Sequence, residues 1–132
     1  MKTNTKLVVG FALAIAIVAI SAHFLRNQQP EATATAVLVL IPETGPAAEY
    51  ARYSRMGFDL GVDAAKKQGL PRMDLIFSDT KSNPKDGLSA LQQSLIARKP
   101  ALVVSLLSSV TKAVAPVLAE QGIPVIANAV AA

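Results

Sequence analysis

The chain has 132 residues, of which 52% are hydrophobic and 17% charged, so it is long enough for one small globular domain and too apolar to be disordered. Its formal net charge is +4. Two of the thirteen basic residues, Lys2 and Lys6, precede an apolar N-terminal run, which leaves eleven basic residues against nine acidic ones. That balance, with no tryptophan for base stacking, argues against nucleic-acid binding.

Cysteine is absent, and the only histidine is His23. The chain therefore has no disulfide, no thiol nucleophile, no thiolate metal site and no lipid-bearing cysteine. A Ser/His/Asp arrangement would have to rely on His23, which lies just after the apolar run. We expect no metal, no cofactor and no enzymatic activity.

An uncharged apolar run occupies residues 7–22. A basic start, such a run and small residues near its end are typical of an export signal. Extended to Leu25, the run reaches the length that spans a bilayer, so residues 1–26 are interpreted as a signal peptide or a membrane anchor, with a buried core helix as a third alternative. Signal and anchor both place the remaining chain outside the cytoplasm. Residues 27–35 are polar, lack periodicity and are interpreted as a linker.

Short apolar runs, separated by helical patterns, fill the rest of the chain. Their composition and flanking glycines and prolines predict strands at 36–41, 73–77, 101–107 and 124–127. The first of these is β-branched-rich and unbroken, which is the pattern of a strand covered on both faces. We expect it to be the central strand.

Three helices are predicted from apolar side chains at three-to-four spacing. The first carries this pattern over residues 51–65, with Arg55 among the residues at this spacing. The second follows a polar loop, with Asn83 as its cap and Asp86 placed to reach back to that cap. The third is predicted over 110–121 and ends at a glycine.

Strands and helices thus alternate as β-α-β-α-β-α-β with short connections. Right-handed crossovers convert this order into an α/β fold, a parallel sheet with helices on both faces. We assign residues 36–132 to this unit and expect a hydrophobic helix before it at the N-terminus.

In an open parallel sheet, ligands bind beyond the carboxyl ends of the strands. Three segments are expected to meet there, namely 42–50, 107–111 and the residues from Asn128 onward. Nucleotide binding is disfavoured because neither G-x-G-x-x-G nor G-x-x-x-x-G-K-[ST] occurs. The acids nearest the second strand, Asp74, Asp79 and Asp86, are interpreted as loop and cap residues rather than as a metal site, since no histidine joins them.

Polar side chains at the start of the third helix are the strongest candidates for ligand contact. Ser108, Ser109 and Thr111 combine hydroxyls with the amides of a helix start, an arrangement that favours a carboxylate or another small anion. The alternative is that Ser109 only caps its own helix. Tyr50 could offer an aromatic face with a polar tip, or could simply pack.

Six stretches carry the pattern of a known family in order along the chain: 41–50, 57–58, Asp79, 82–85, 108–111 and 122–126. By these residues the sequence resembles the solute-binding proteins of branched-chain amino-acid ABC transporters, which are type 1 periplasmic binding proteins of the leucine-binding kind. The resemblance runs from Ala36 to the last residue and corresponds to part of the N-terminal lobe.

The resemblance also implies a site. In such proteins two α/β lobes close on an amino acid, and the first lobe holds its carboxylate and amino groups. Ligand contacts are thereby implied for Tyr50, Ser108, Ser109, Thr111, Ala129 and Ala131. Because Ala131 stands where amino-acid-binding members carry threonine, one hydroxyl contact is missing here.

Three function classes follow. The first is an extracytoplasmic, periplasmic solute-binding protein of an ABC importer, truncated to part of one lobe. It would bind a small polar solute such as an amino acid and deliver it to a permease in the inner membrane. The alternative is a membrane-anchored ligand-sensing ectodomain with the same fold, favoured if residues 1–26 stay uncut. An exported α/β enzyme is the third. We expect the 132-residue chain alone to bind no amino acid tightly.

Overall fold

A computed structural model describes residues 34–128 of the chain. The predicted hydrophobic helix at the N-terminus lies outside these residues, as do Ala129 and Ala131. All the described helices and strands belong to one compact unit. Among the described helices, none is long and apolar enough to cross a membrane.

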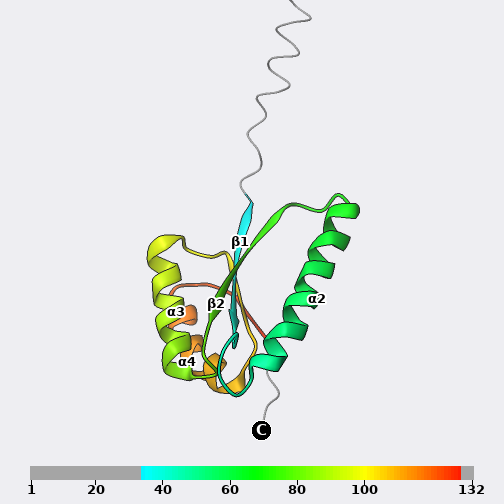
Figure 1. Ribbon diagram of the computed structural model, residues 1–132. Helices are drawn as coiled ribbons and strands as arrows, with labels where there is room; N and C mark the ends of the chain where they lie inside the picture. The colour runs from blue at the N-terminus through cyan, green and yellow to red at the C-terminus, as the bar shows by residue number, and fades with distance from the viewer. Residues whose placement is uncertain (1–33, 129–132) are drawn as a thin grey trace, which may run out of the picture. The chain divides into compact units, whose positions relative to one another are not determined.

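The elements alternate in the predicted order. They are β1 (Thr35–Ile41), α2 (Ala48–Lys67), β2 (Met73–Asp79), α3 (Pro84–Ala97), β3 (Leu102–Ser105), α4 (Ser108–Glu120) and β4 (Val125–Ala127). The four strands form one parallel sheet in the order β2-β1-β3-β4. The α/β fold with β1 at the centre is therefore confirmed, and α2 covers one face of the sheet while α3 and α4 cover the other (Figure 1).

The core explains why β1 is so apolar. Its side chains alternate between two clusters: Leu38 and Leu40 pack with α3 and α4, whereas Val39 and Ile41 pack on the side of α2. All four are 0% exposed, as expected for a central parallel strand with both faces covered. Substitution of any one by alanine would leave a cavity in the core.

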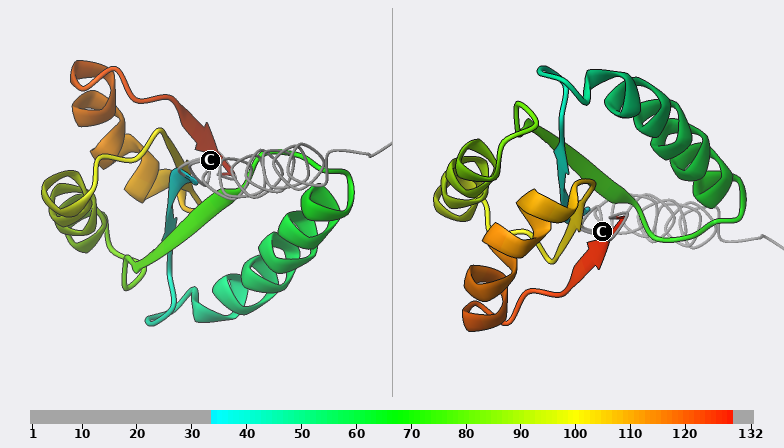
Figure 2. Two further views of the ribbon diagram at one scale, coloured as in Figure 1. Left: turned by 90° about the horizontal axis from the view of Figure 1, so that it is seen from above. Right: turned by 90° about the horizontal axis from the view of Figure 1, so that it is seen from below.

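The two faces are covered unequally. Helices α3 and α4 pack on each other as well as on the sheet, and Leu91, Val110, Val114 and Leu118 are at most 1% exposed. On the opposite face, Ala51 is the one residue of α2 that is buried. Figure 2 shows α3 and α4 together on one side of the strands and α2 alone on the other.

Several boundaries differ from the sequence-based expectation. Strand β2 runs to Asp79 and so includes two residues predicted as loop, because its register with β1 continues to the pair Ile41–Asp79. Strand β3 is shorter than the predicted 101–107, and helix α4 begins at Ser108, two residues earlier than expected.

Three predicted helix positions can be compared with the structure, and one of them, Asp86, is wrong. Arg55 lies at the margin of the core: its guanidinium is 4.0 Å from the centre of the Phe77 ring and hydrogen-bonded to Glu43, and its side chain is 44% exposed. Asn83 caps α3 as predicted, accepting a hydrogen bond from the Lys85 amide at 2.8 Å. Asp86 does not reach back to it, because the Asn83 amide is already bonded to the Thr80 carbonyl and Asp86 pairs with Lys81 instead.

Candidate ligand-binding site

The carboxyl ends of β1, β3 and β4 lie level with one another. Leu40 is in register with Ser105, and Ser105 with Ala127, so the segments that follow these strands emerge at one edge of the sheet. A depression of about 460 Å³ opens at this edge, lined by Tyr50, Ser54, Leu106, Leu107, Ser108 and Asn128. The predicted meeting of three loops on one rim is confirmed.

Helix α4 starts directly at this depression. The residue before it is Leu107, whose apolar side chain cannot cap a helix, and the Thr111 amide makes the first bond back to the Leu107 carbonyl at 2.8 Å. A helix start directs its first-turn amides outward and carries the positive end of the helix dipole. The cap position of α4 is held by Leu107, which makes no side-chain cap bond, and Ser109 lies inside the helix, so the alternative that Ser109 serves only as the helix cap is wrong.

The predicted hydroxyls occupy different positions. Ser108 is half-buried and lines the depression, whereas Ser109 is exposed on the first turn of α4. The Thr111 hydroxyl lies behind the rim, hydrogen-bonded to Ser105 Oγ at 2.8 Å and to the Leu107 carbonyl oxygen at 2.9 Å. Ser105 is 0% exposed, so Thr111 joins the buried end of β3 to the start of α4.

Tyr50 comes from the first turn of α2 and lines the other side of the depression, with 69% of its surface exposed. The exposure leaves its ring and hydroxyl accessible to a bound molecule. Sequence reasoning did not name Ser54, which lies one turn further along α2 on the side that faces the sheet. A polar residue three positions after the buried Ala51 was the signal that could have identified it.

The side chains that line the depression are uncharged. Its six lining residues supply two serine hydroxyls, a phenol, an amide and two leucine side chains, and no ionised group. Across residues 34–128, no group of three or more acidic, histidine or cysteine side chains could hold a metal ion. An anion in the depression could therefore bind through hydrogen bonds at the start of α4, next to the apolar side chains of the lining.

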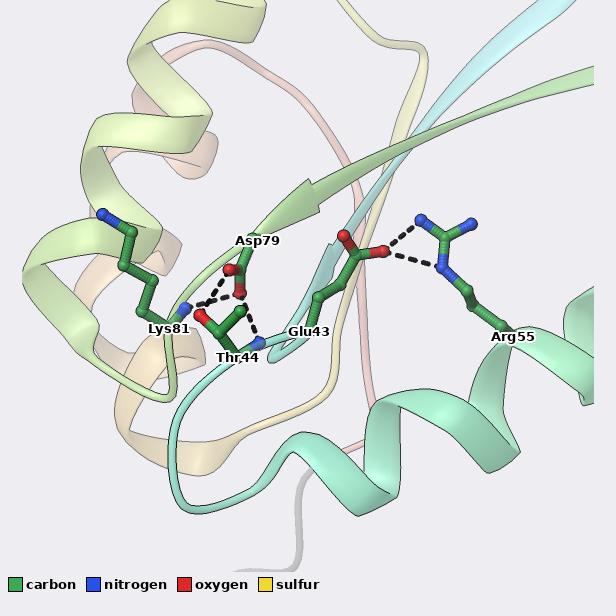
Figure 3. Close-up of polar contacts among 5 residues, drawn as sticks. All are labelled: Glu43, Thr44, Arg55, Asp79 and Lys81. Atoms are coloured by element: carbon green, nitrogen blue, oxygen red, sulfur yellow. Dashed lines mark hydrogen bonds and ion pairs between the residues drawn. The ribbon is translucent and has the colours of Figure 1, made fainter.

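The β1–α2 loop, which leads to Tyr50, is held by a neighbouring loop. Asp79 accepts hydrogen bonds from Thr44 Oγ at 2.6 Å, from the Thr44 amide at 3.2 Å and from the Lys81 amide at 2.8 Å (Figure 3). Ser82 Oγ donates to the Thr44 carbonyl at 3.1 Å and accepts from the Ala47 amide at 3.0 Å. We call this set of contacts between residues 44–47 and 79–82 the loop clasp.

A second set of contacts holds the same loop from the side of α2. Arg55 donates two hydrogen bonds to the Glu43 carboxylate, as Figure 3 shows, one of them from Nε at 2.7 Å. The cation also stacks on Phe77, whose ring meets Phe58 edge to face at 5.7 Å. The path from β1 to the first turn of α2 is therefore fixed by polar contacts on both flanks.

The loop clasp predicts a pH effect on stability. Burial raises the pKa of Asp79, but the hydrogen bonds from Thr44 Oγ and from the backbone amides of Lys81, Thr44 and Glu43 outweigh it, so the pKa is lowered below its ordinary 3.8. A carboxylate with a depressed pKa contributes stability above its unfolded-state pKa and loses it as pH falls through the folded-state value.

We therefore expect the chain to lose part of its unfolding free energy through this group as pH falls below the unfolded-state pKa and through the lower folded-state pKa. The variant Asp79→Asn, which cannot ionise, should be less stable than the parent at neutral pH and should approach it in acid. Urea denaturation across this range measures the difference. A gap between the two proteins that stays constant with pH would contradict the assignment.

A sequence comparison shows which protein family the chain belongs to. Residues 35–132 match the sequence profile of the family described as periplasmic binding protein. The chain belongs to the periplasmic binding protein family. No curated protein sequence matches the chain significantly.

Solved structures agree on the fold of this periplasmic binding protein lobe. The branched-chain amino acid transporter substrate-binding protein LivJ from Streptococcus pneumoniae, in complex with isoleucine, aligns with a TM-score of 0.68 and 22% identity over 75% of this chain and 30% of its own. A leucine-binding protein LivK from Thermotoga maritima gives 0.63 and 20%, over 72% of this chain and 27% of its own.

A third structure broadens the range of ligands. The solute-binding protein of an ABC transporter from Rhodopseudomonas palustris BisB5, in complex with 3,4-dihydroxybenzoic acid, has a TM-score of 0.64 and 20% identity over 73% of this chain and 27% of its own. The periplasmic binding protein chain described here thus spans roughly 30% of the length of these relatives.

Proposed function

We propose that this chain is part of the first lobe of an extracytoplasmic solute-binding protein that serves an ABC importer. The observation that carries the proposal is the start of α4, whose cap residue is the apolar Leu107 and which lies at a depression that no ionised side chain lines. Such a site holds a carboxylate by hydrogen bonds alone, without chemical change to the ligand.

The ligands of the solved relatives support a carboxylate. Isoleucine and 3,4-dihydroxybenzoic acid, named with two of those structures, differ in size, polarity and the presence of an ammonium group, but both carry a carboxyl group. We propose that Ser108 and Ser109 contact this group, that Tyr50 covers it from α2, and that Thr111 contributes from behind the rim. Ala129 and Ala131 are proposed to close the site beside Asn128.

The remaining parts of the proposal follow from the family. A periplasmic location, export by residues 1–26 and delivery of the solute to an inner-membrane permease are proposed together. The alternative of an anchored sensor ectodomain depends on whether residues 1–26 are cleaved. Sequencing of the N-terminus of the exported protein distinguishes the two.

Ligand binding can be tested directly. We expect isoleucine or 3,4-dihydroxybenzoate to shift the backbone amide NMR signals of the first turn of α4, with weak affinity because one lobe supplies only part of the contacts. The corresponding carboxamides should shift them far less. Loss of one hydrogen bond to a charged group in Ser108→Ala should weaken binding about tenfold or more.

The matched control is Ser89→Ala, the same substitution at an exposed site on α3. It should bind each carboxylate as the parent does. Equal shifts from acids and carboxamides, or equal binding by Ser108→Ala and the parent, would count against a carboxylate site at α4.

A further inference from the structure

Helices α3 and α4 lie on the same face of the sheet (Figure 2) and approach each other closely at Gly87. Gly87 is buried in the first turn of α3, where its amide donates to the Asn83 carbonyl oxygen at 3.0 Å. A Cβ added there would lie 2.6 Å from Val110 Cγ1, well inside the 3.4 Å at which ordinary contact begins. Val110 follows Ser108 and Ser109 in the first turn of α4. The contact therefore joins α3 to the turn that carries the candidate ligand-binding hydroxyls.

The backbone gives no reason for a glycine at this position. Gly87 is not among the glycines with a positive φ, and it lies inside a regular helix. Alanine fits that conformation and favours a helix more strongly than glycine does. The close approach of Val110, rather than the path of the chain, therefore explains the missing side chain.

The core prevents Val110 from moving aside. Its side chain is 0% exposed and packs in the core cluster with Leu91 and Val114. Valine in a helix has one strongly preferred rotamer, so rotation of the side chain does not free the space. The three atoms nearest to the added Cβ all belong to Val110, namely Cγ1 at 2.6 Å, Cγ2 at 3.4 Å and Cβ at 3.5 Å. A methyl group at Gly87 would therefore push the two helices apart.

The start of α3 is the more firmly held of the two. Asn83 caps α3 with its side chain, and the preceding residues 79–82 form the loop clasp. The cap residue of α4 is Leu107, which makes no side-chain cap bond. We therefore expect the first turn of α4, rather than α3, to take up most of the displacement.

We propose that Gly87 is a positioning residue of the ligand site, an inference that rests on the carboxylate site proposed above. The absence of a side chain at Gly87 lets α3 support the first turn of α4 at close range. This support fixes the hydroxyls of Ser108 and Ser109 and the amide of Val110, which lies in the turn whose amides have no partner within the helix. Opening the contact from 2.6 Å to 3.4 Å would be enough to lose a hydrogen bond to a ligand.

Gly87→Ala tests the proposal by its effect on binding. In an NMR titration of the full chain with isoleucine or 3,4-dihydroxybenzoate, folded Gly87→Ala should bind about tenfold more weakly than the parent, the loss expected for one hydrogen bond to a charged group. The matched control is Gly61→Ala in α2, where the added Cβ meets no atom within 4 Å. It should raise the urea midpoint of unfolding and leave binding unchanged. A Gly87→Ala variant that loses stability but keeps the affinity of the parent would show a packing role only and refute the proposal.

A second substitution shows whether Val110 is the cause. Val110→Ala removes both methyl groups nearest to the added Cβ and leaves the Cβ of residue 110 at 3.5 Å, an ordinary contact. Gly87→Ala should lower the urea midpoint and the affinity in the parent, but should raise both in Val110→Ala, where the new methyl group fills the space left by valine. Losses of similar size in both proteins would contradict the proposal. The increase expected in Val110→Ala remains measurable even if Gly87→Ala alone does not fold.

Amide hydrogen exchange separates this proposal from the ligand-binding one, because it requires no ligand. The Thr111 amide donates to the Leu107 carbonyl oxygen at 2.8 Å in the first turn of α4. In Gly87→Ala its exchange should accelerate more than that of the Leu118 amide, about two turns further along. If the parent binds no carboxylate, the proposed function fails, and the exchange rates alone decide whether Gly87 positions α4. Equal acceleration at both amides would reflect global destabilisation and overturn the proposal.

Discussion

Gly45→Ala should destabilise the chain by about 2–4 kcal/mol, the largest effect we expect from a single methyl group. Gly45 has a φ of 90°, a left-handed backbone conformation that strains any residue with a side chain. Its added Cβ would also lie 2.6 Å from the Lys81 carbonyl oxygen and 2.9 Å from Ser82 Oγ. The loop clasp would have to open to accept it.

The matched control separates these two causes. Gly69 has a φ of 70°, but a Cβ there meets no atom within 4 Å. Gly69→Ala should therefore show the backbone strain alone, about 1–2 kcal/mol. Urea denaturation gives both values, and equal losses for the two variants would show that the contact with Lys81 and Ser82 does not constrain the loop.

Opening the loop clasp should also lower the affinity of the ligand site for a carboxylate. Residues 44–47 lead directly into α2, whose first turn carries Tyr50. We expect Gly45→Ala to weaken carboxylate binding in protein that is still folded, while Gly69→Ala, at the far end of α2, leaves it unchanged.

The sequence was sufficient to predict the fold because most of its local signals agree. The apolar run of β1 needs cover on both faces, Asn83 and Pro84 start α3, and Gly122, with a φ of 64°, ends α4. Each of these signals acts within a few residues. The short connections between strands and helices then favour a parallel sheet. Boundaries shifted where pairing between strands, rather than local preference, decided them, as at Asp79.

The candidate site was predictable in place but not in detail. Parallel strands bring their carboxyl ends to one edge, so the meeting of Tyr50, Ser108 and Asn128 followed from the order of elements. The loop clasp joins residues about 35 positions apart, and no periodicity in the sequence reports such a contact. The partners of Arg55 were unpredictable for the same reason, since the hydrogen bond to Glu43 and the stacking on Phe77 are tertiary contacts.

Thr111→Val should destabilise the chain by about 1–3 kcal/mol, although valine has nearly the shape of threonine. The threonine hydroxyl is hydrogen-bonded to Ser105 Oγ and to the Leu107 carbonyl oxygen, and Ser105 is 0% exposed. Valine would leave the Ser105 hydroxyl buried without this partner. Thermal or urea unfolding measures the loss, and Thr111→Ser, which keeps the hydroxyl, should retain most of the stability.

A double substitution distinguishes an internal role of this hydroxyl from direct ligand contact. If Thr111 acts by satisfying Ser105, then Ser105→Ala combined with Thr111→Val removes both polar partners and should recover much of the lost stability. Carboxylate binding should recover with it, because the start of α4 regains its position. Stability that recovers while binding stays lost would instead place the Thr111 hydroxyl on the ligand itself.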